Sequence, residues 1–234
     1  MINSYISVDL ETTGLNPKTD KIIEIGAVRI ENGVETGTFE TFVNPGRRLE
    51  EKIITLTGIT DSDLQDAPDI AQVLPGFLEF AKELPLLGHS VLFDFSFLKK
   101  AAVNRKLTFE REGVDTLKIA RKYLAELPHR NLSYLCEYYQ IPHQAHRALE
   151  DARATIHLYQ KLWEQFGKAE ETTLFYPARL IYQAKKDSPI TKNQKERLYK
   201  LIRQHKMDTV YDIEKLTKSE ASRYTDRILA EYGR

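Results

Sequence analysis

The N-terminal segment 4–14, SYISVDLETTG, constrains the fold of this chain more than any other stretch. Its β-branched and aromatic residues favour a strand, and side chains along a strand alternate between its two faces. The apolar residues therefore point to one face, while Asp9 and Glu11 lie side by side on the other. Taken alone, two such acids fit a solvated strand face as well as a cation site, so the rest of the chain must decide between these interpretations.

An α/β order of elements follows this strand. Two ranges, 21–30 and 35–43, alternate apolar and polar residues around an Asn-Gly pair, which predicts a hairpin and an antiparallel meander of three strands. Periodic apolar residues predict the later elements, which are strands at 84–88 and 114–117 and helices at 70–83, after Asp94, and at 118–126, 131–139 and 148–166. The expected fold is α/β, a mixed five-stranded sheet in which three antiparallel strands are followed by parallel crossovers, flanked by helices.

The connection at 44–69 is long and has prolines near both ends. Loops of this length inside a compact domain are usually functional. We therefore expect it to contribute to a binding site, and Thr57 in its middle could brace a ligand.

Charge divides the chain into two parts. Residues 1–167 hold 19 of the 34 basic and 24 of the 34 acidic residues, a net charge near −5. Residues 168–234 hold the other 15 basic and 10 acidic residues, a net charge near +5. We expect a body at 1–167, a linker at 168–190 and a small basic helical module at 191–234, whose helices begin at capping boxes. The role of the module is open, since its cations either bind phosphates or form a solvated face.

Several classes of protein are excluded by the sequence pattern. No run of about 18 apolar residues exists, so no membrane-spanning helix and no membrane partner are expected. The N-terminal residues show no secretory signal, which predicts a cytoplasmic location. Cys136 is the single cysteine, so neither an internal disulfide nor a thiolate metal cluster is expected.

Two more acids occupy positions where such a sheet can gather them. Asp94 follows the predicted strand at 84–88, and Asp151 lies near the start of the last body helix. Each alone is an ordinary acid near a helix N-terminus, but both can converge on Asp9 and Glu11 because the strands end at one edge. Four carboxylates this close need counter-charge, and oxygen ligands favour hard cations. The expected cofactor is a pair of Mg²⁺ or Mn²⁺ ions, the arrangement that hydrolyses phosphodiesters.

His146 lies five residues before Asp151 and so belongs to the turn before the helix. A neutral imidazole beside an activated water suits a general base near pH 7. The alternative is that His129, His143 and His146 are polar residues of an exposed loop.

Three motifs that contain these residues, VDLETTG, LFDFSFL and HRALEDA, match in order and spacing those of the DEDDh 3′-to-5′ exonucleases. Over about residues 1–166 the chain resembles this family, in particular the epsilon proofreading subunit of bacterial DNA polymerase III. The resemblance implies a ribonuclease H-like fold, with His146 as the base and metal ligands at Asp9, Glu11, Asp94 and Asp151. It also implies release of nucleoside 5′-monophosphates from single-stranded 3′ ends, with DNA favoured.

The same resemblance implies contacts with the terminal nucleotide. The residues that would line its site are Leu10, Thr12, Thr13, Thr57 and Phe93. Ser90 departs from the pattern, because many members have asparagine after the histidine, and we expect this change to alter the support of Asp94.

Two other functions stay open from the sequence. The same fold could trim RNA, since discrimination of the sugar depends on contacts to the 2′ position. A non-catalytic module that only binds nucleic acid is the second alternative. A DNA polymerase, or another replication or repair protein, is the expected protein partner.

Overall fold

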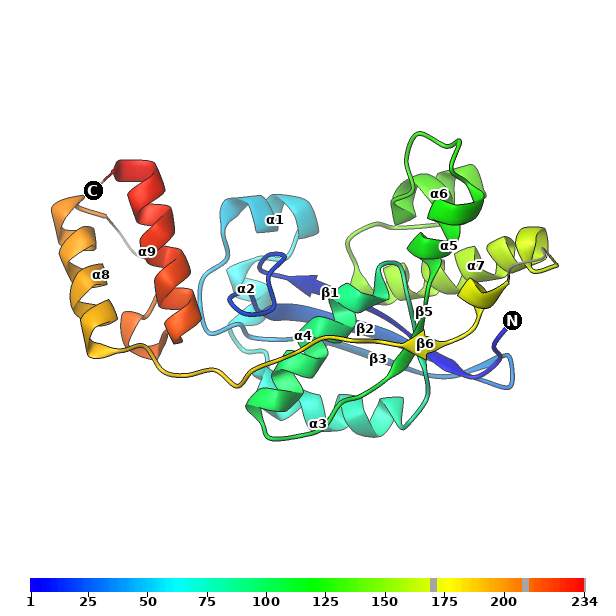
Figure 1. Cartoon of the computed structure of the whole chain (residues 1–234), viewed down its shortest axis with the longest axis horizontal. Helices are drawn as coiled ribbons and strands as arrows, with labels where there is room; N and C mark the ends of the chain where they lie inside the picture. The colour runs from blue at the N-terminus through cyan, green and yellow to red at the C-terminus, as the bar shows by residue number, and fades with distance from the viewer. Residues whose placement is uncertain (169–171, 208–210, 234) are drawn as a thin grey trace.

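The computed structural model describes residues 1–168, 172–207 and 211–233 of the chain. Its centre is a sheet in the order β3-β2-β1-β4-β5-β6 (Figure 1). The strands are Tyr5–Thr12 (β1), Ile22–Glu31 (β2), Val34–Phe42 (β3), Leu86–Gly88 (β4), Glu112–Asp115 (β5) and Ala178–Arg179 (β6). β1 to β3 pair antiparallel, β4 runs parallel to both β1 and β5, and β6 pairs antiparallel with β5. The predicted mixed sheet is confirmed, with a sixth strand, β6, beyond the five expected.

The β2–β3 hairpin forms where the sequence predicts it. Asn32 and Gly33 have φ values of 53° and 80°. Positive φ at both central residues is the requirement of the turn that matches the twist of paired strands, and asparagine and glycine tolerate it best.

Helices cover both faces of the sheet (Figure 1). Those of the body are Glu51–Thr57 (α1), Asp61–Leu64 (α2), Ile70–Ala81 (α3), Val91–Asn104 (α4), Thr116–Tyr123 (α5), Leu132–Tyr138 (α6) and Ala148–Phe166 (α7). α3 and α4 pack on the face that carries Ile6 and Leu86, and α5 to α7 pack on the face that carries Tyr5 and Leu87. Neighbouring strand residues thus feed two separate cores, as the alternation along a strand requires.

Two local details differ from the sequence prediction. The connection 44–69 is not a bare loop, because α1 and α2 lie in it and pack on a small cluster that includes Ile23 and Ile59. α2 begins at a capping box formed by Thr60 and Asp63, a signal that was available in the sequence. α4 begins at Val91, so Asp94 does not precede this helix but lies in its first turn.

The predicted linker, 168–190, carries a 3₁₀ helix at Thr173–Phe175 (η1) as well as β6. Phe175 is fully buried in the core beneath α7, and its carbonyl oxygen accepts a hydrogen bond from the Tyr159 hydroxyl at 2.7 Å. The first part of this segment therefore packs on the body. Residues 169–171 of the predicted linker, and 208–210 and 234 of the predicted module, lie outside the described residues.

The C-terminal module (residues 191–234) contains two helices, Lys192–Gln204 (α8) and Lys218–Tyr232 (α9), with a 3₁₀ helix at Ile213–Lys215 (η2) between them. Both expected capping boxes are present, at Thr191 and Thr217. The module has a hydrophobic cluster of its own, separate from the two cores of the body. Ion pairs connect it to the body, among them Arg223 with Asp20 at 2.6 Å.

Cys136 is buried and free, as expected from its being the single cysteine. Across the part of the chain that the structure describes, no helix combines the length and the apolar character needed to cross a membrane.

Candidate active site

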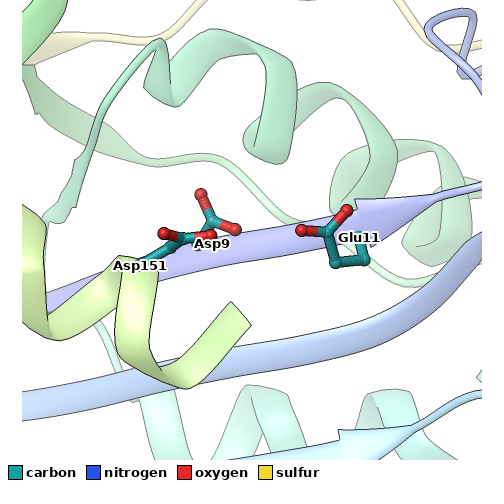
Figure 2. Close-up of side chains that lie close together, drawn as sticks. All are labelled: Asp9, Glu11 and Asp151. Atoms are coloured by element: carbon teal, nitrogen blue, oxygen red, sulfur yellow. The ribbon is translucent and has the colours of Figure 1, made fainter. Parts of the chain in front are cut away.

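Three of the predicted ligands meet above the middle of the sheet. Carboxylate oxygens of Asp9, Glu11 and Asp151 all lie within 4.8 Å of one another. Figure 2 shows Asp9 and Asp151 pointing toward each other, with Glu11 farther along β1. The Ser7 hydroxyl donates a hydrogen bond of 2.7 Å to the Ala152 carbonyl oxygen, which ties β1 to the first turns of α7. This contact helps to hold Asp9 and Asp151, which are 142 positions apart in the chain, at one site.

The start of α7 is placed by β2. A Cβ on Gly26 would lie 2.1 Å from the backbone of Ala148 and Leu149, so only glycine allows this approach of helix and strand. Beside it, the Glu24 carboxylate accepts a hydrogen bond of 3.2 Å from the Ala148 N–H and pairs with Arg147 at 3.2 Å. Glu24 is 1% exposed. These contacts set the position of Asp151 one turn farther along α7.

Asp94 borders the same site from the other side of β1. It is buried in the first turn of α4, and its carboxylate accepts a hydrogen bond from the Leu10 N–H. Burial is the main reason that the pKa of Asp94 lies well above its usual range, and the charges of Asp115 and Glu11 raise it further. Asp94 is not among the three residues whose oxygens lie within 4.8 Å, but it is close enough to act on Asp9.

Burial and mutual repulsion oppose ionisation of this cluster. Burial, followed by the charges of Asp94, Asp151 and Glu11, raises the pKa of Asp9 well above its usual range. Burial, followed by Asp151 and Glu24, raises the pKa of Glu11 to about 7. A divalent cation would remove the repulsion, and carboxylate oxygens are the donors that hard cations prefer. The donor set therefore fits a divalent metal ion.

Two histidines reach the acids from the loop before α7. His146 lies in the turn before the helix, as expected, with a φ of 66°. Its backbone N–H donates to Asp151 at 3.0 Å, and its Nδ1 lies 3.9 Å from Oε1 of Glu11, while 46% of its side chain is exposed. His143, which the sequence interpretation did not single out, contacts Asp151 Oδ1 directly through Nε2. No periodicity in the loop distinguishes it from an exposed polar residue.

The residues expected at the terminal nucleotide lie in different surroundings. Leu10 is buried in the core beside α4, and the ring of Phe93 lies 5.0 Å from that of Phe97. The Thr12 hydroxyl donates to the Gly14 carbonyl oxygen at 2.7 Å. The Thr57 hydroxyl donates to the Ile53 carbonyl oxygen and accepts from the Ile59 N–H, so both of its bonds stay within the α1 segment.

Ser90 sits immediately before α4 with a φ of 80°. Its side chain makes no capping bond, while its backbone N–H donates to Asp115 at 3.0 Å. This position therefore supports the start of α4, and through it Asp94, by backbone contacts.

Arg47 is a further residue that the sequence interpretation missed. Its guanidinium donates to the Thr13 hydroxyl at 2.6 Å and to the Thr19 carbonyl oxygen at 3.0 Å. It also lies 3.7 Å from Glu220 of α9. Arg47 thus connects the end of β1 to the C-terminal module, across more than 170 residues of sequence, for which no local pattern exists.

Comparison with known proteins identifies the class to which this fold belongs. A family model described as an exonuclease, RNase_T, matches residues 6–159. This range covers more than half of the chain, and the chain belongs to this exonuclease family.

Similar proteins include bacterial DNA polymerases III of the PolC type. The protein of Caldanaerobacter subterraneus subsp. tengcongensis is 45% identical over 163 residues, which are 69% of this chain and 12% of that protein. The protein of Oceanobacillus iheyensis is 33% identical over 241 residues, which cover 97% of this chain and 17% of that protein. The second match therefore takes in the C-terminal module. The chain spans less than a fifth of the length of these relatives.

Among solved structures, exonuclease X in complex with 5′ overhanging duplex DNA is 24% identical, with a TM-score of 0.55 over 72% of this chain and 96% of that chain. This likeness supports the predicted ribonuclease H-like arrangement of the sheet and helices.

Proposed function

We propose that this protein is a metal-dependent 3′-to-5′ exonuclease that removes nucleoside 5′-monophosphates from single-stranded 3′ ends of DNA. The observation that carries the proposal is the meeting of Asp9, Glu11 and Asp151 within 4.8 Å beside His146. The family match supports exonuclease chemistry, and the resemblance of the three motifs supports the direction of attack.

In this proposal two Mg²⁺ or Mn²⁺ ions would be held by the three clustered acids together with Asp94 as the fourth ligand. Ions at such a site would supply an activated water and charge stabilisation for the leaving oxygen. The chain's own residues do the rest. His146 accepts the proton of the attacking water at Nε2, because its Nδ1 faces Glu11. The half-exposed ring of His146 can return the proton to solvent.

DNA is the favoured substrate because relatives that align with nearly all of this chain are DNA polymerases of the PolC type. Those proteins are much longer than this chain, so a role in proofreading beside a DNA polymerase is part of the proposal. The separate hydrophobic cluster of the C-terminal module supports the proposed division into a body at 1–167, a linker and a module at 191–234.

A degradation assay tests the proposal. A 5′-labelled single-stranded oligonucleotide incubated with Mg²⁺ or Mn²⁺ should give a ladder of shortening products, and EDTA should stop it. Asp9→Ala should abolish the ladder while circular dichroism shows an unchanged fold, since the change relieves like-charge crowding. Folded protein that binds the oligonucleotide without shortening it would instead identify a binding module.

The choice between DNA and RNA requires a direct comparison. Matched DNA and RNA oligomers of one sequence should be degraded with kcat/KM in favour of DNA. A mispaired 3′ end should be removed faster than a paired one if the enzyme proofreads. Faster degradation of RNA would make the chain an RNA-trimming enzyme of the same fold.

A further inference from the structure

A basic groove lies where the linker, the body and the C-terminal module meet, and none of the clustered acids lines it. It has a volume of about 520 Å³. We call it the lysine groove, after the residues Lys18, Lys100, Lys185, Lys186 and Lys218 that line it. Four segments far apart in sequence supply these residues: the turn after β1, α4, the linker, and the first residue of α9 (Figure 1).

The charge of the groove is largely uncompensated. Lys100 is buried and pairs with Asp187 at 2.6 Å, which balances that cation. The other four lysines are exposed, and within the described part of the chain their ammonium groups form no ion pair. The body, residues 1–167, has a net charge near −5. The four exposed lysines of the groove therefore form a positive patch beside a body that is acidic as a whole. Their mutual repulsion would be relieved by a bound polyanion.

The walls of the groove are held in place by specific contacts. The Lys100 ammonium also donates to the Lys185 carbonyl oxygen, and the Asn104 side chain donates to Asp187 at 2.8 Å. These bonds attach the linker to α4. At the other wall the Lys218 N–H donates to the Ser188 carbonyl oxygen at 2.9 Å. Lys185 and Lys186 therefore lie on a linker that is attached to α4, and Lys218 lies on a helix that is attached to the same linker.

The groove adjoins the proposed active site through α4. It shares Lys100 and Asp187 with a cavity of about 260 Å³ that is also lined by Phe97. The ring of Phe97 contacts that of Phe93, one residue before Asp94, in a tilted arrangement with the ring centroids 5.0 Å apart. Lys100 follows Asp94 by six residues on the same helix, a rise of about 9 Å. α4 thus runs from the acid cluster, at Asp94, to the wall of the groove, at Lys100.

We propose that the lysine groove binds the sugar-phosphate backbone of the unpaired substrate strand, a few nucleotides upstream of the 3′ end that is cut. This inference rests on the proposed nuclease function and extends it. It places the main polyanion contact at the junction of linker, body and module. The basic helix α8 has its own shallow hollow, but residues of α8 alone line that hollow, and Lys195 of this helix pairs with Glu214.

Binding in EDTA, where no turnover occurs, tests the groove on the full-length chain. Fluorescence anisotropy of a labelled 12-nucleotide oligodeoxythymidine gives the slope of log affinity against log salt. Each phosphate contact to a single strand contributes about 0.7 to that slope. The fourfold variant Lys18→Gln/Lys185→Gln/Lys186→Gln/Lys218→Gln should reduce it by about 2 to 3 and weaken binding at least about tenfold at low salt. Its kcat/KM on a dinucleotide, which is too short to reach the groove, should match the parent.

The matched control, Arg197→Gln/Lys200→Gln/Arg203→Gln/Lys206→Gln, removes three charges from α8 and one from Lys206 just after it, and should leave the slope unchanged. If the fourfold groove variant does not fold, Lys185→Gln/Lys186→Gln should still lower the slope by about 1.4. An unchanged slope in the groove variant, or an equal loss in the α8 control, would overturn the proposal. So would equally tight binding of a blunt 12-base-pair duplex. A parent that binds through the groove but degrades nothing would reject the nuclease function and keep the site.

Discussion

Removing the charge of Glu11 should stabilise the metal-free protein, and the size of the effect follows from the burial of this carboxyl and from the acids around it. The pKa of this carboxyl rises from an ordinary 4.5 to about 7, chiefly through burial and then through repulsion by Asp151 and Glu24. At about 1.4 kcal/mol per pKa unit, this difference corresponds to about 3 kcal/mol. Without bound cations, ionised Glu11 therefore lowers the free energy of unfolding by up to about 3 kcal/mol.

The dependence on pH has a definite sign. Because the pKa is higher in the folded than in the unfolded chain, the folded state retains the proton longer as pH rises. The parent thus loses this stability between about pH 4.5 and pH 7. Glu11→Gln cannot ionise and escapes the loss. In EDTA the variant should exceed the parent by less than about 1 kcal/mol at pH 5 and by about 3 kcal/mol at pH 8.

Urea unfolding followed by circular dichroism at both pH values measures these differences. Glu79→Gln, on the exposed face of α3, is the matched control and should follow the parent at each pH. Added Mn²⁺ should stabilise the parent more than Glu11→Gln, because an ion that binds only the folded state raises its stability. If Glu11→Gln gained the same stability over the parent at pH 5 and at pH 8 in EDTA, the idea that burial and repulsion of an ionised Glu11 oppose folding would be refuted.

Four further predictions follow from contacts in the structure. Gly26→Ala should cost about 1–3 kcal/mol in urea unfolding and reduce nuclease activity, because its Cβ would meet the backbone at the start of α7. His146→Gln should lower kcat by about 10²- to 10⁴-fold as expected for loss of a general base. His143→Gln should instead raise the Mn²⁺ concentration for half-maximal activity by about 10- to 100-fold, because its ring orients Asp151. Ion pairs of Arg223 and Arg227 connect α9 to the body. The double variant Arg223→Ala/Arg227→Ala should therefore have a larger radius of gyration than the parent in small-angle scattering at low salt. Addition of 1 M NaCl should increase the radius of gyration of the parent in the same way, because salt screens these pairs.

Each of these has an outcome that contradicts it. A Gly26→Ala protein with the stability of the parent would mean that α7 does not depend on the close approach to β2. Equal losses of kcat in both histidine variants, with no change in metal requirement, would remove the distinction between base and orienting residue. A radius of gyration that ignores both salt and the arginine changes would show that the module is held by something other than charge.

Much of the fold was predictable because its signals are local. Alternation along β1 predicted that Asp9 and Glu11 share a face, and the 3.6-residue period predicted α7 with the bounds found, Ala148–Phe166. The capping boxes at Thr191 and Thr217 predicted both helices of the module. α1 and α2 were missed in part because a capping box at Thr60 was not used, which was a failure of interpretation and not of the sequence.

The sequence by itself determined the elements and the acids they carry, since burial of one face and capping of a helix end leave periodic marks within a few residues. Only the tertiary structure decided which distant groups meet: Gly26 under the start of α7, Glu24 against Arg147, His143 on Asp151, and four segments around the lysine groove. Such contacts join residues that are many positions apart, and packing selects them by shape and charge. A local pattern carries no record of that choice.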